Sequence, residues 1–193
     1  RKDLPAADVA ALVADAKSRP GALTYGSTGN GSASHLAAEL FKTRAGIDLL
    51  HVPFKGAAPM TTELLAGRID VAFATLPSVI SQIEAGELRA LAVASGRRSS
   101  RLPAVPTLAE AGVPGVEADA WFALFAPAGT PAAAIDRLYA AIAAALARPA
   151  VADVMARQGV APTVRAPAVL AAALPAEVAK WAEVVRVSGA RVD

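Results

Sequence analysis

The sequence predicts an α/β fold, in which short buried strands alternate with helices and pair in parallel. Two observations support this prediction. Between residues 22 and 94, short apolar runs alternate with segments whose apolar residues recur at helical spacing. Glycine follows several of the helical segments, as Gly67 and Gly86 do, which is typical of helix ends. A chain of 193 residues is long enough for one domain or two small lobes.

The first part of the chain is predicted to alternate regularly. A first helix is expected over residues 8–18, where Val9, Leu12 and Val13 are apolar and Pro20 follows the end. The elements expected next are strand 22–25, helix 33–44, strand 49–52, helix 58–66, strand 69–74, helix 78–84 and strand 88–94. This order predicts a parallel-rich sheet flanked by helices.

The second part of the chain has a different character. Residues 101–115 are rich in proline and glycine, and Thr107 and Glu110 have capping-box spacing around a single turn. An extended run follows at residues 117–126. Helices are then predicted at about 131–147, 150–158 and 166–187, with Thr130 as the cap of the first and Pro131 at its first helical position. Amphipathic helices of this kind need a partner surface.

The composition excludes several classes of protein. Hydrophobic residues make up 54% and charged residues 19% of the chain, which is typical of a folded globular protein. The net charge is only +2 and basic residues are scattered, so no nucleic-acid partner is expected. The absence of cysteine removes thiol catalysis and cysteine-based metal sites. No signal peptide or membrane span is recognised, and the start at Arg1 is interpreted as that of a processed product or a fragment.

The most informative segment is the glycine- and serine-rich stretch at residues 25–35. It follows a predicted strand and opens helix 33–44, so glycine can bring backbone N–H groups together at the positive end of the helix dipole. Serine, threonine and asparagine add short hydrogen-bonding groups. On these residues alone two interpretations remain open: a cradle for a small anion such as a carboxylate or phosphate, or a tight turn followed by a serine N-cap.

Catalysis is not expected from these residues. Ser34 and His35 are neighbours on a helix and do not face each other, so they do not form the nucleophile and base of a hydrolase. The chain contains no Gly-x-Ser-x-Gly elbow, and its glycine loop lacks the endings of a P-loop and of a dinucleotide-binding turn. His35 and His51 are far apart in the sequence without matched carboxylates, so no metal site is expected.

Six motifs in a fixed order identify a family. They occupy residues 23–36, 51–59, 64–73, 91–95, 105–112 and 121–131 and read LTYGSTGNGSASHL, HVPFKGAAP, LLAGRIDVAF, LAVAS, VPTLAEAG and WFALFAPAGTP. Together they closely resemble the extracytoplasmic solute-binding proteins of tripartite tricarboxylate transporters, the Bug or TctC family. The resemblance implies a periplasmic protein of the periplasmic-binding-protein-like (type II) fold. Such a protein binds a small carboxylate between two lobes, passes it to membrane permease subunits, and uses no cofactor or metal.

The resemblance also implies which residues bind the ligand. They are Ser27, Thr28, Gly29, Asn30, Gly31, Ser32 and Ser34 in the carboxylate loop, His35 behind it, Lys55 and Gly56 in a second loop, Thr75 after strand 69–74, and Trp121 and Phe122 at the crossing between the lobes. Gly29 and Gly31 are expected to act mainly as backbone donors. Thr75 departs from the family, which commonly has aspartate there.

Several of these residues have a structural interpretation beside the functional one. His35 either contacts the ligand or packs and hydrogen-bonds the loop, and His51 is interpreted as a structural histidine within a strand. Lys55 either pairs with an acid or is solvated. Trp121 and Phe122 form either a cleft wall or part of the core.

The resemblance divides the chain into parts. Residues 1–21 are expected to form an N-terminal helix and crossover, 22–115 a complete second lobe, 116–130 a hinge, and 131–193 the C-terminal helical part of a first lobe whose remainder is absent. The chain should then bind ligand weakly or not at all, and an uncovered apolar surface should favour self-association. Two alternatives remain: a ligand-sensing or interaction module of the same fold, and a small α/β hydrolase.

Overall fold

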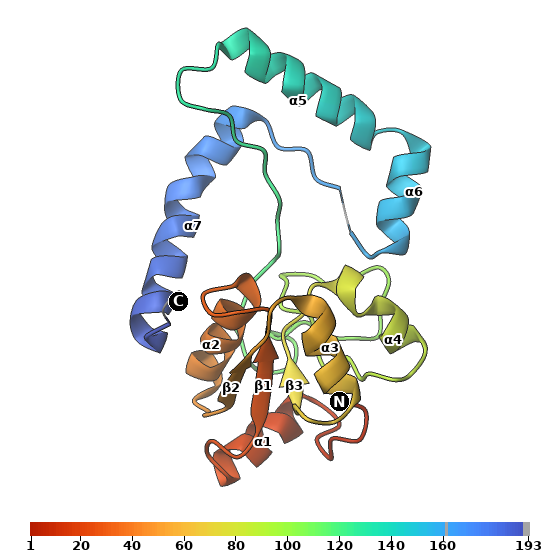
Figure 1. The fold of residues 1–193 in the computed structure, drawn as a ribbon, viewed down its shortest axis with the longest axis vertical. Helices are drawn as coiled ribbons and strands as arrows, with labels where there is room; N and C mark the ends of the chain where they lie inside the picture. The colour runs from red at the N-terminus through yellow and green to blue at the C-terminus, as the bar shows by residue number, and fades with distance from the viewer. Residues whose placement is uncertain (161, 191–193) are drawn as a thin grey trace.

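The computed structural model describes residues 1–160 and 162–190, which form a small α/β lobe and a helical arch above it (Figure 1). In chain order the elements are α1 (Val9–Ser18), β1 (Thr24–Ser27), α2 (Ala33–Ala45), β2 (Leu50–Pro53), α3 (Ala57–Leu65), β3 (Val71–Ala72), the 3-10 turn η1 (Leu76–Ser78), α4 (Ile80–Glu84), α5 (Ala132–Leu146), α6 (Pro149–Arg157) and α7 (Pro167–Ser188). We call residues 1–118 the lobe and the helices α5, α6 and α7 the arch.

The lobe is built on three parallel strands in the order β2-β1-β3. In the central strand, Tyr25 lies beside His51 of β2 and Val71 of β3. All three strands end at the edge of the sheet that faces the arch (Figure 1). Because the loops at the carboxyl ends of parallel strands share one edge, the loops after β1, β2 and β3 come together there. The predicted parallel α/β organisation is confirmed.

Residues 88–94 do not form the strand that the sequence predicts. Only Val93 makes a bridge, with Thr107. The ladder cannot extend in one direction because Pro106 has no N–H. In the other direction it would need the N–H of Glu110, which donates instead to Thr107 Oγ1 at 3.1 Å. The Thr107 N–H in turn donates to Glu110 Oε2 at 2.8 Å, so the predicted capping box is confirmed and itself ends the pairing.

Other boundaries also differ from the prediction. The strand expected over residues 69–74 is only Val71–Ala72. Before its start, the Asp70 carboxylate accepts hydrogen bonds from the N–H and hydroxyl of Thr24, so the Thr24 N–H is not available for strand pairing. The helix expected over residues 78–84 is divided between η1 and α4. Thr130 does not cap α5. Its hydroxyl donates to the Pro127 carbonyl at 2.8 Å, and Pro131 is the N-cap.

Two hydrophobic clusters cover the two faces of the sheet. The first joins α1, α2 and one face of the sheet, and its largest members include Leu12, Leu23, Tyr25, Phe41 and Leu49. The second joins α3, α4 and the other face through Met60, Leu64, Ile69, Val79 and Leu88. Gly26 lies between Tyr25 and Ser27 on the central strand and faces the second cluster. A Cβ there would lie 2.4 Å from Ile69 Cδ1, so only glycine permits this close approach.

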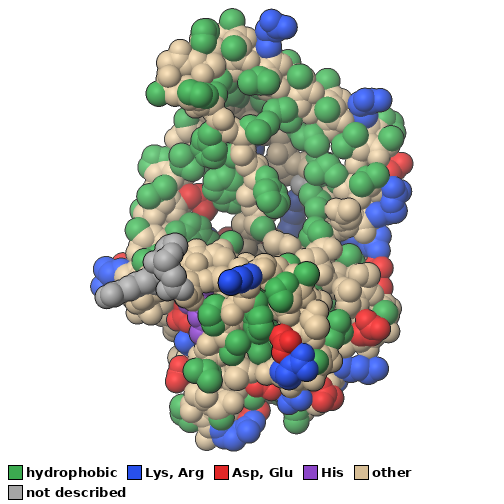
Figure 2. Space-filling view, in the orientation of Figure 1, with side chains coloured by type: hydrophobic (Ala, Val, Ile, Leu, Met, Phe, Trp, Pro, Cys, Tyr) green, Lys and Arg blue, Asp and Glu red, His purple; other side chains and the backbone are tan. Residues whose placement is uncertain are grey.

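The arch contacts the lobe at both of its ends. Val184 of α7 is buried in the first cluster, with the partly buried Trp181 packed against the same cluster, and α7 lies against α2. Just after α6, Gly159 lies so close to Leu76 of η1 that an added Cβ would be 2.4 Å from the Leu76 Cδ2. Between these ends, Figure 2 shows a hollow beneath the arch, with apolar side chains gathered around it. The segment between residue 118 and α5 joins the lobe to the arch and is also exposed. Within it, Phe122 is 92% exposed.

Replacing Gly26 with alanine tests the close packing of the central strand. We expect Gly26→Ala to lower the free energy of unfolding by about 1–3 kcal/mol, because the new methyl group overlaps Ile69. Urea unfolding measured by circular dichroism checks this. Gly96→Ala is the matched control, since its Cβ would meet nothing closer than 3.7 Å. Equal stability of the two variants would contradict the packing described here.

Candidate functional site

The glycine-rich loop joins β1 to α2 at the edge of the sheet that faces the arch. Ser32 is the N-cap of α2, and its hydroxyl accepts a hydrogen bond from the His35 N–H at 3.3 Å. Gly29 and Gly31 have φ angles of 137° and 70°, which side chains rarely allow. The two glycines therefore let the chain turn from the strand into the helix within a few residues.

Three hydroxyl groups converge at the first turn of α2. The Ser34 hydroxyl accepts from the Thr28 N–H at 2.8 Å and lies 2.9 Å from Thr28 Oγ1. Ser32 Oγ lies 3.0 Å from Ser34 Oγ and donates to the Gly29 carbonyl at 2.7 Å. The loop is thus held by its own side chains, and it presents hydroxyls beside a helix N-terminus.

The amides of the two glycines are used inside the loop. The Gly29 N–H donates to Ser27 Oγ at 3.2 Å, and the Gly31 N–H donates to Nδ1 of His35 at 3.0 Å. Gly31 was expected to act as a backbone donor to a ligand. In this arrangement its N–H donates to His35 and fixes the turn instead. The amides of Ala33 and Ser34 lie in the first turn of α2, where no preceding helical carbonyl can accept from them. They are the backbone donors that the helix end presents.

A stack of three rings lies behind the loop. The ring centroids of Tyr25 and His51 are 4.7 Å apart, and those of His51 and His35 are 4.0 Å apart. The Tyr25 hydroxyl donates to Glu39 Oε1 at 2.5 Å, and Lys42 Nζ contacts the same oxygen at 2.9 Å. The two histidines are far apart in the sequence. The register of β1 with β2 and the packing of α2 bring them together.

The environment of the stack keeps both imidazoles neutral. Burial lowers the pKa of His35, and burial together with the neighbouring His35 lowers the pKa of His51 to about 4. Burial and the hydrogen bond to Glu39 raise the pKa of the Tyr25 phenol. The expected structural interpretation of His51 is supported, since its Nε2 lies 2.7 Å from Ser27 Oγ. His35 hydrogen-bonds the loop, as one of its two interpretations required.

The second loop lies directly beside the first. The Phe54 N–H donates to the Ser27 carbonyl at 3.0 Å, and the Gly56 N–H donates to the Thr28 carbonyl at 3.2 Å. Gly56 has a φ of 106° and is the N-cap of α3, and Lys55 beside it is exposed. The structure therefore brings Lys55 and Gly56 to the edge that carries the glycine-rich loop.

The remaining predicted residues lie around this edge at different places. Thr75 follows β3, is exposed, and donates from Oγ1 to Ser78 Oγ at 3.3 Å. Trp121 and Phe122 lie in the segment that joins the lobe to the arch. They are 46% and 92% exposed, so they are not core residues in this structure.

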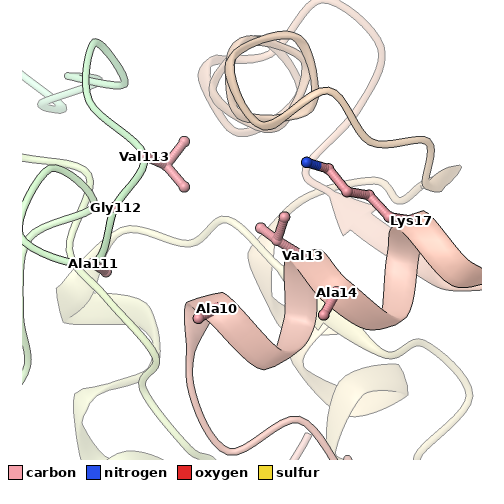
Figure 3. A pocket seen from close by; sticks show the side chains of 7 residues that line it. All are labelled: Ala10, Val13, Ala14, Lys17, Ala111, Gly112 and Val113. Atoms are coloured by element: carbon pink, nitrogen blue, oxygen red, sulfur yellow. The ribbon is translucent and has the colours of Figure 1, made fainter.

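Two cavities of the lobe lie apart from the glycine-rich loop. One, of about 350 Å³, lies between α1 and the turn at residues 111–113, with Val13, Lys17 and Val113 on its walls (Figure 3). The other, of about 420 Å³, lies between α3 and α4 and includes Thr61, Ser78 and Gln82. Neither includes a residue of the glycine-rich loop.

Metal and membrane signals are weak. In the part of the chain that the structure describes, no three histidine or acidic side chains come together as a possible metal site. Among residues 1–160 and 162–190, no single helix is long and apolar enough to cross a bilayer. The pair α5 and α6 would be by length and composition, but the two are bent by 72°.

A parallel α/β lobe with a hydroxyl-lined loop at a helix N-terminus has the architecture of the periplasmic-binding-protein fold. The family model described as the tripartite tricarboxylate transporter family receptor, TctC, matches residues 1–189. The chain belongs to this family, and the resemblance identified from the six motifs is confirmed.

Individual relatives agree with this assignment. The chain is 40% identical over 182 residues to protein BugT of Bordetella pertussis, covering 94% of this chain and 56% of BugT. It matches the structure of R. palustris Rpa4515 with adipate at 38% identity and a TM-score of 0.89, covering all of this chain and 64% of that one. MatC from Rhodopseudomonas palustris with bound malate matches at 32% identity and a TM-score of 0.86, covering 96% and 64%. The chain spans about half the length of the curated relatives it matches.

The Tyr25 hydroxyl offers a test of the support behind the loop. We expect Tyr25→Phe to lower the free energy of unfolding by about 1–3 kcal/mol, because the buried Glu39 carboxylate loses one of its two donors and keeps only Lys42. Thermal and urea unfolding measure this. Tyr139→Phe on the half-buried face of α5 is the control and should stay within about 0.5 kcal/mol of the parent. A Tyr25 variant as stable as the control would show that the Glu39 contact contributes little.

Proposed function

We propose that this chain is part of a periplasmic receptor that captures a small carboxylate and delivers it to the membrane permease subunits of a tripartite tricarboxylate transporter. The observation that carries the proposal is the convergence of the Thr28, Ser32 and Ser34 hydroxyls at the first turn of α2. Residues 27–34 contain no ionisable side chain. A carboxylate would therefore be held by hydroxyls, by amides and by the helix dipole, without an arginine clamp.

The ligand class is supported by the relatives. Rpa4515 was solved with adipate and MatC with bound malate, and both ligands are dicarboxylates. In this proposal one carboxylate binds at the amides of Ala33 and Ser34, and Gly56, Lys55 and Thr75 line the same edge. The rest of the ligand extends toward the arch, where Trp121 and Phe122 form a wall. Their exposure in this chain fits a surface that ligand and a facing lobe would cover.

The division of the chain into lobes is part of the same proposal. Residues 22–115 form one complete lobe, 1–21 a helix and crossover packed on it, 116–130 the crossing segment, and 131–193 a portion of the opposite lobe. The rest of the length of the relatives has no counterpart in this chain. We infer that, in a full-length receptor, the part without a counterpart in this chain covers the apolar side of the arch. Leu138 and Val154 are exposed on that side. Self-association of the chain would use the same surface.

The arrangement of these side chains favours a receptor over an enzyme. One serine does contact a histidine, since Ser27 Oγ lies 2.7 Å from His51 Nε2. Ser27 is fully buried, however, so a substrate has no access to its hydroxyl. The Ser34 hydroxyl contacts Thr28 and Ser32. A sensory module of the same fold would bind the same ligands and differ only in its partner.

Isothermal calorimetry with adipate and malate tests the proposal. Because the chain carries one side of the cleft, we expect weak binding, with a dissociation constant of about 1 mM or more. Ser34→Ala removes the central hydroxyl and should weaken binding about fivefold, which corresponds to one hydrogen bond. Ser81→Ala on the exposed face of α4 is the control.

Two results would contradict the proposal. Unchanged affinity in the Ser34 variant would remove the glycine-rich loop from the site. Micromolar binding by the chain alone would show that one side of the cleft is enough. Light scattering on the same samples gives the molar mass, so that self-association can be separated from ligand binding.

A further inference from the structure

The histidine behind the loop is held in one tautomer by the loop itself. The Gly31 N–H donates to Nδ1 of His35 at 3.0 Å. A backbone N–H can donate only to a ring nitrogen that carries a lone pair, so the proton of the neutral ring is on Nε2. If His35 gained a second proton, Nδ1–H would face the Gly31 N–H, and two donors would meet where one hydrogen bond now lies.

A second imidazole secures the beginning of the same turn. His51 Nε2 lies 2.7 Å from Ser27 Oγ. Ser27 Oγ in turn accepts from the Gly29 N–H and donates to the Gly29 carbonyl, both at 3.2 Å. The rings of His35 and His51 are stacked, with their centroids 4.0 Å apart. The contact of His35 with Gly31 and that of His51 with Ser27 are therefore supported by the same pair of rings. His51 holds the start of the glycine-rich turn and His35 holds its end.

We propose that His35, backed by His51, is a positioning residue for the carboxylate loop, and that a proton on His35 releases Gly31 and loosens the loop. The effect of this loosening on ligand binding rests on the proposed function. The hydrogen bond between His35 and Gly31 does not, because both groups belong to this chain. The loop is then fixed when both rings are neutral, and its order decreases in acid.

The charged groups that surround the two histidine rings come from α2, from the residues just after it, and from α7. From α2, Glu39 favours and Lys42 opposes a positive charge on both rings, and Lys42 lies 3.7 Å from Asp48 after that helix. From β1, Tyr25 faces His51 and donates to Glu39. The ionic groups of α7, which packs on α2, make contacts of their own: Lys180 with the Glu117 carbonyl, Glu177 with Trp181, and Glu183 with Arg186.

The pH window follows from the environment of the rings. Burial lowers the pKa of both histidines below the ordinary value of 6.5, that of His51 to about 4. The unfolded or loosened chain therefore binds more protons than the ordered one between pH 6.5 and about 4. The ordered loop is fully favoured above pH 6.5 and loses that advantage as the pH falls through this window. Because two stacked imidazoles do not readily carry two charges, they titrate as a coupled pair.

Nuclear magnetic resonance on the chain without ligand tests the inference. The measured quantities are the ¹⁵N shifts of the His35 and His51 rings, the Gly31 amide shift, and hydrogen exchange of that amide. We expect the Gly31 amide to shift in step with the His35 ring. His35→Phe removes the acceptor and should speed exchange of the Gly31 amide about tenfold at neutral pH.

Conservative variants separate positioning from simple packing. His35→Asn places an oxygen near the position of Nδ1, so it should restore slow exchange of the Gly31 amide. It should also abolish the pH dependence of the Gly31 amide chemical shift below pH 6.5. His51→Gln should likewise keep the Ser27 contact, whereas His51→Phe should not. If His35→Phe fails to fold, the asparagine variant and the parent still decide the question.

Two results would overturn the inference. One is a Gly31 amide that does not respond while the His35 ring titrates. The other is a His35→Asn variant whose Gly31 amide titrates like that of the parent. These outcomes are independent of the proposed function. If the chain fails to bind adipate or malate while the Gly31 amide still follows His35, the proposed function fails and the positioning role of His35 remains.

Discussion

The stacking of Tyr25 on His51, and of His51 on His35, joins the three elements on which the candidate site depends. Tyr25 is on the central strand, His51 on its neighbour and His35 on the helix whose first turn presents the loop. The hydrogen bond from Tyr25 to Glu39 adds a second connection between strand and helix. Because Tyr25 and His35 are buried, His51 is half-buried and the pKa of both histidines is lowered, the helix is held above the sheet edge without an exposed charge.

Glycine provides the geometry that this stack requires on both sides of the strand. Gly26 permits α3 to pack close to one face, while the residues before and after it direct Tyr25 and Ser27 to the other. Gly29 and Gly31 then turn the chain into α2 with positive φ angles. The loop is thereby rigid before any ligand arrives, which reduces the entropy that binding would cost. A receptor that binds through amides and hydroxyls benefits from such preorganisation, since each contact is weak alone.

Much of the fold could be predicted because local signals and tertiary packing agree. The three arch helices were predicted to within one residue at each end, since their long alanine-rich segments favour helix in any context. Residues 88–94 were predicted as a strand but do not form one, because a strand needs a pairing partner. Pro106 has no N–H for this pairing, and the N–H of Glu110 donates to Thr107 instead. Propensity alone does not reveal such competition.

The sequence indicated which residues gather at this edge of the sheet, but not the hydrogen bonds and ring contacts between them. The sequence indicated the loop residues and the adjoining Lys55 and Gly56. It did not indicate that the Gly31 N–H would donate to His35, or that the ring of His51 would stack on the ring of His35. Both depend on the register of β1 with β2 and on the rotation of α2, which are tertiary properties. Pairing the predicted strands 22–25 and 49–52 end to end would have placed Tyr25 opposite Val52, one residue away from the observed partner His51.

The most direct measurement of the central claim is the change in backbone amide shifts on titration of the chain with adipate. The account predicts that the amides of Ala33 and Ser34 move most, followed by those of Gly56 and Ala57 in the adjoining loop. Changes centred on the cavity between α1 and Val113, with the glycine-rich loop unaffected, would contradict it.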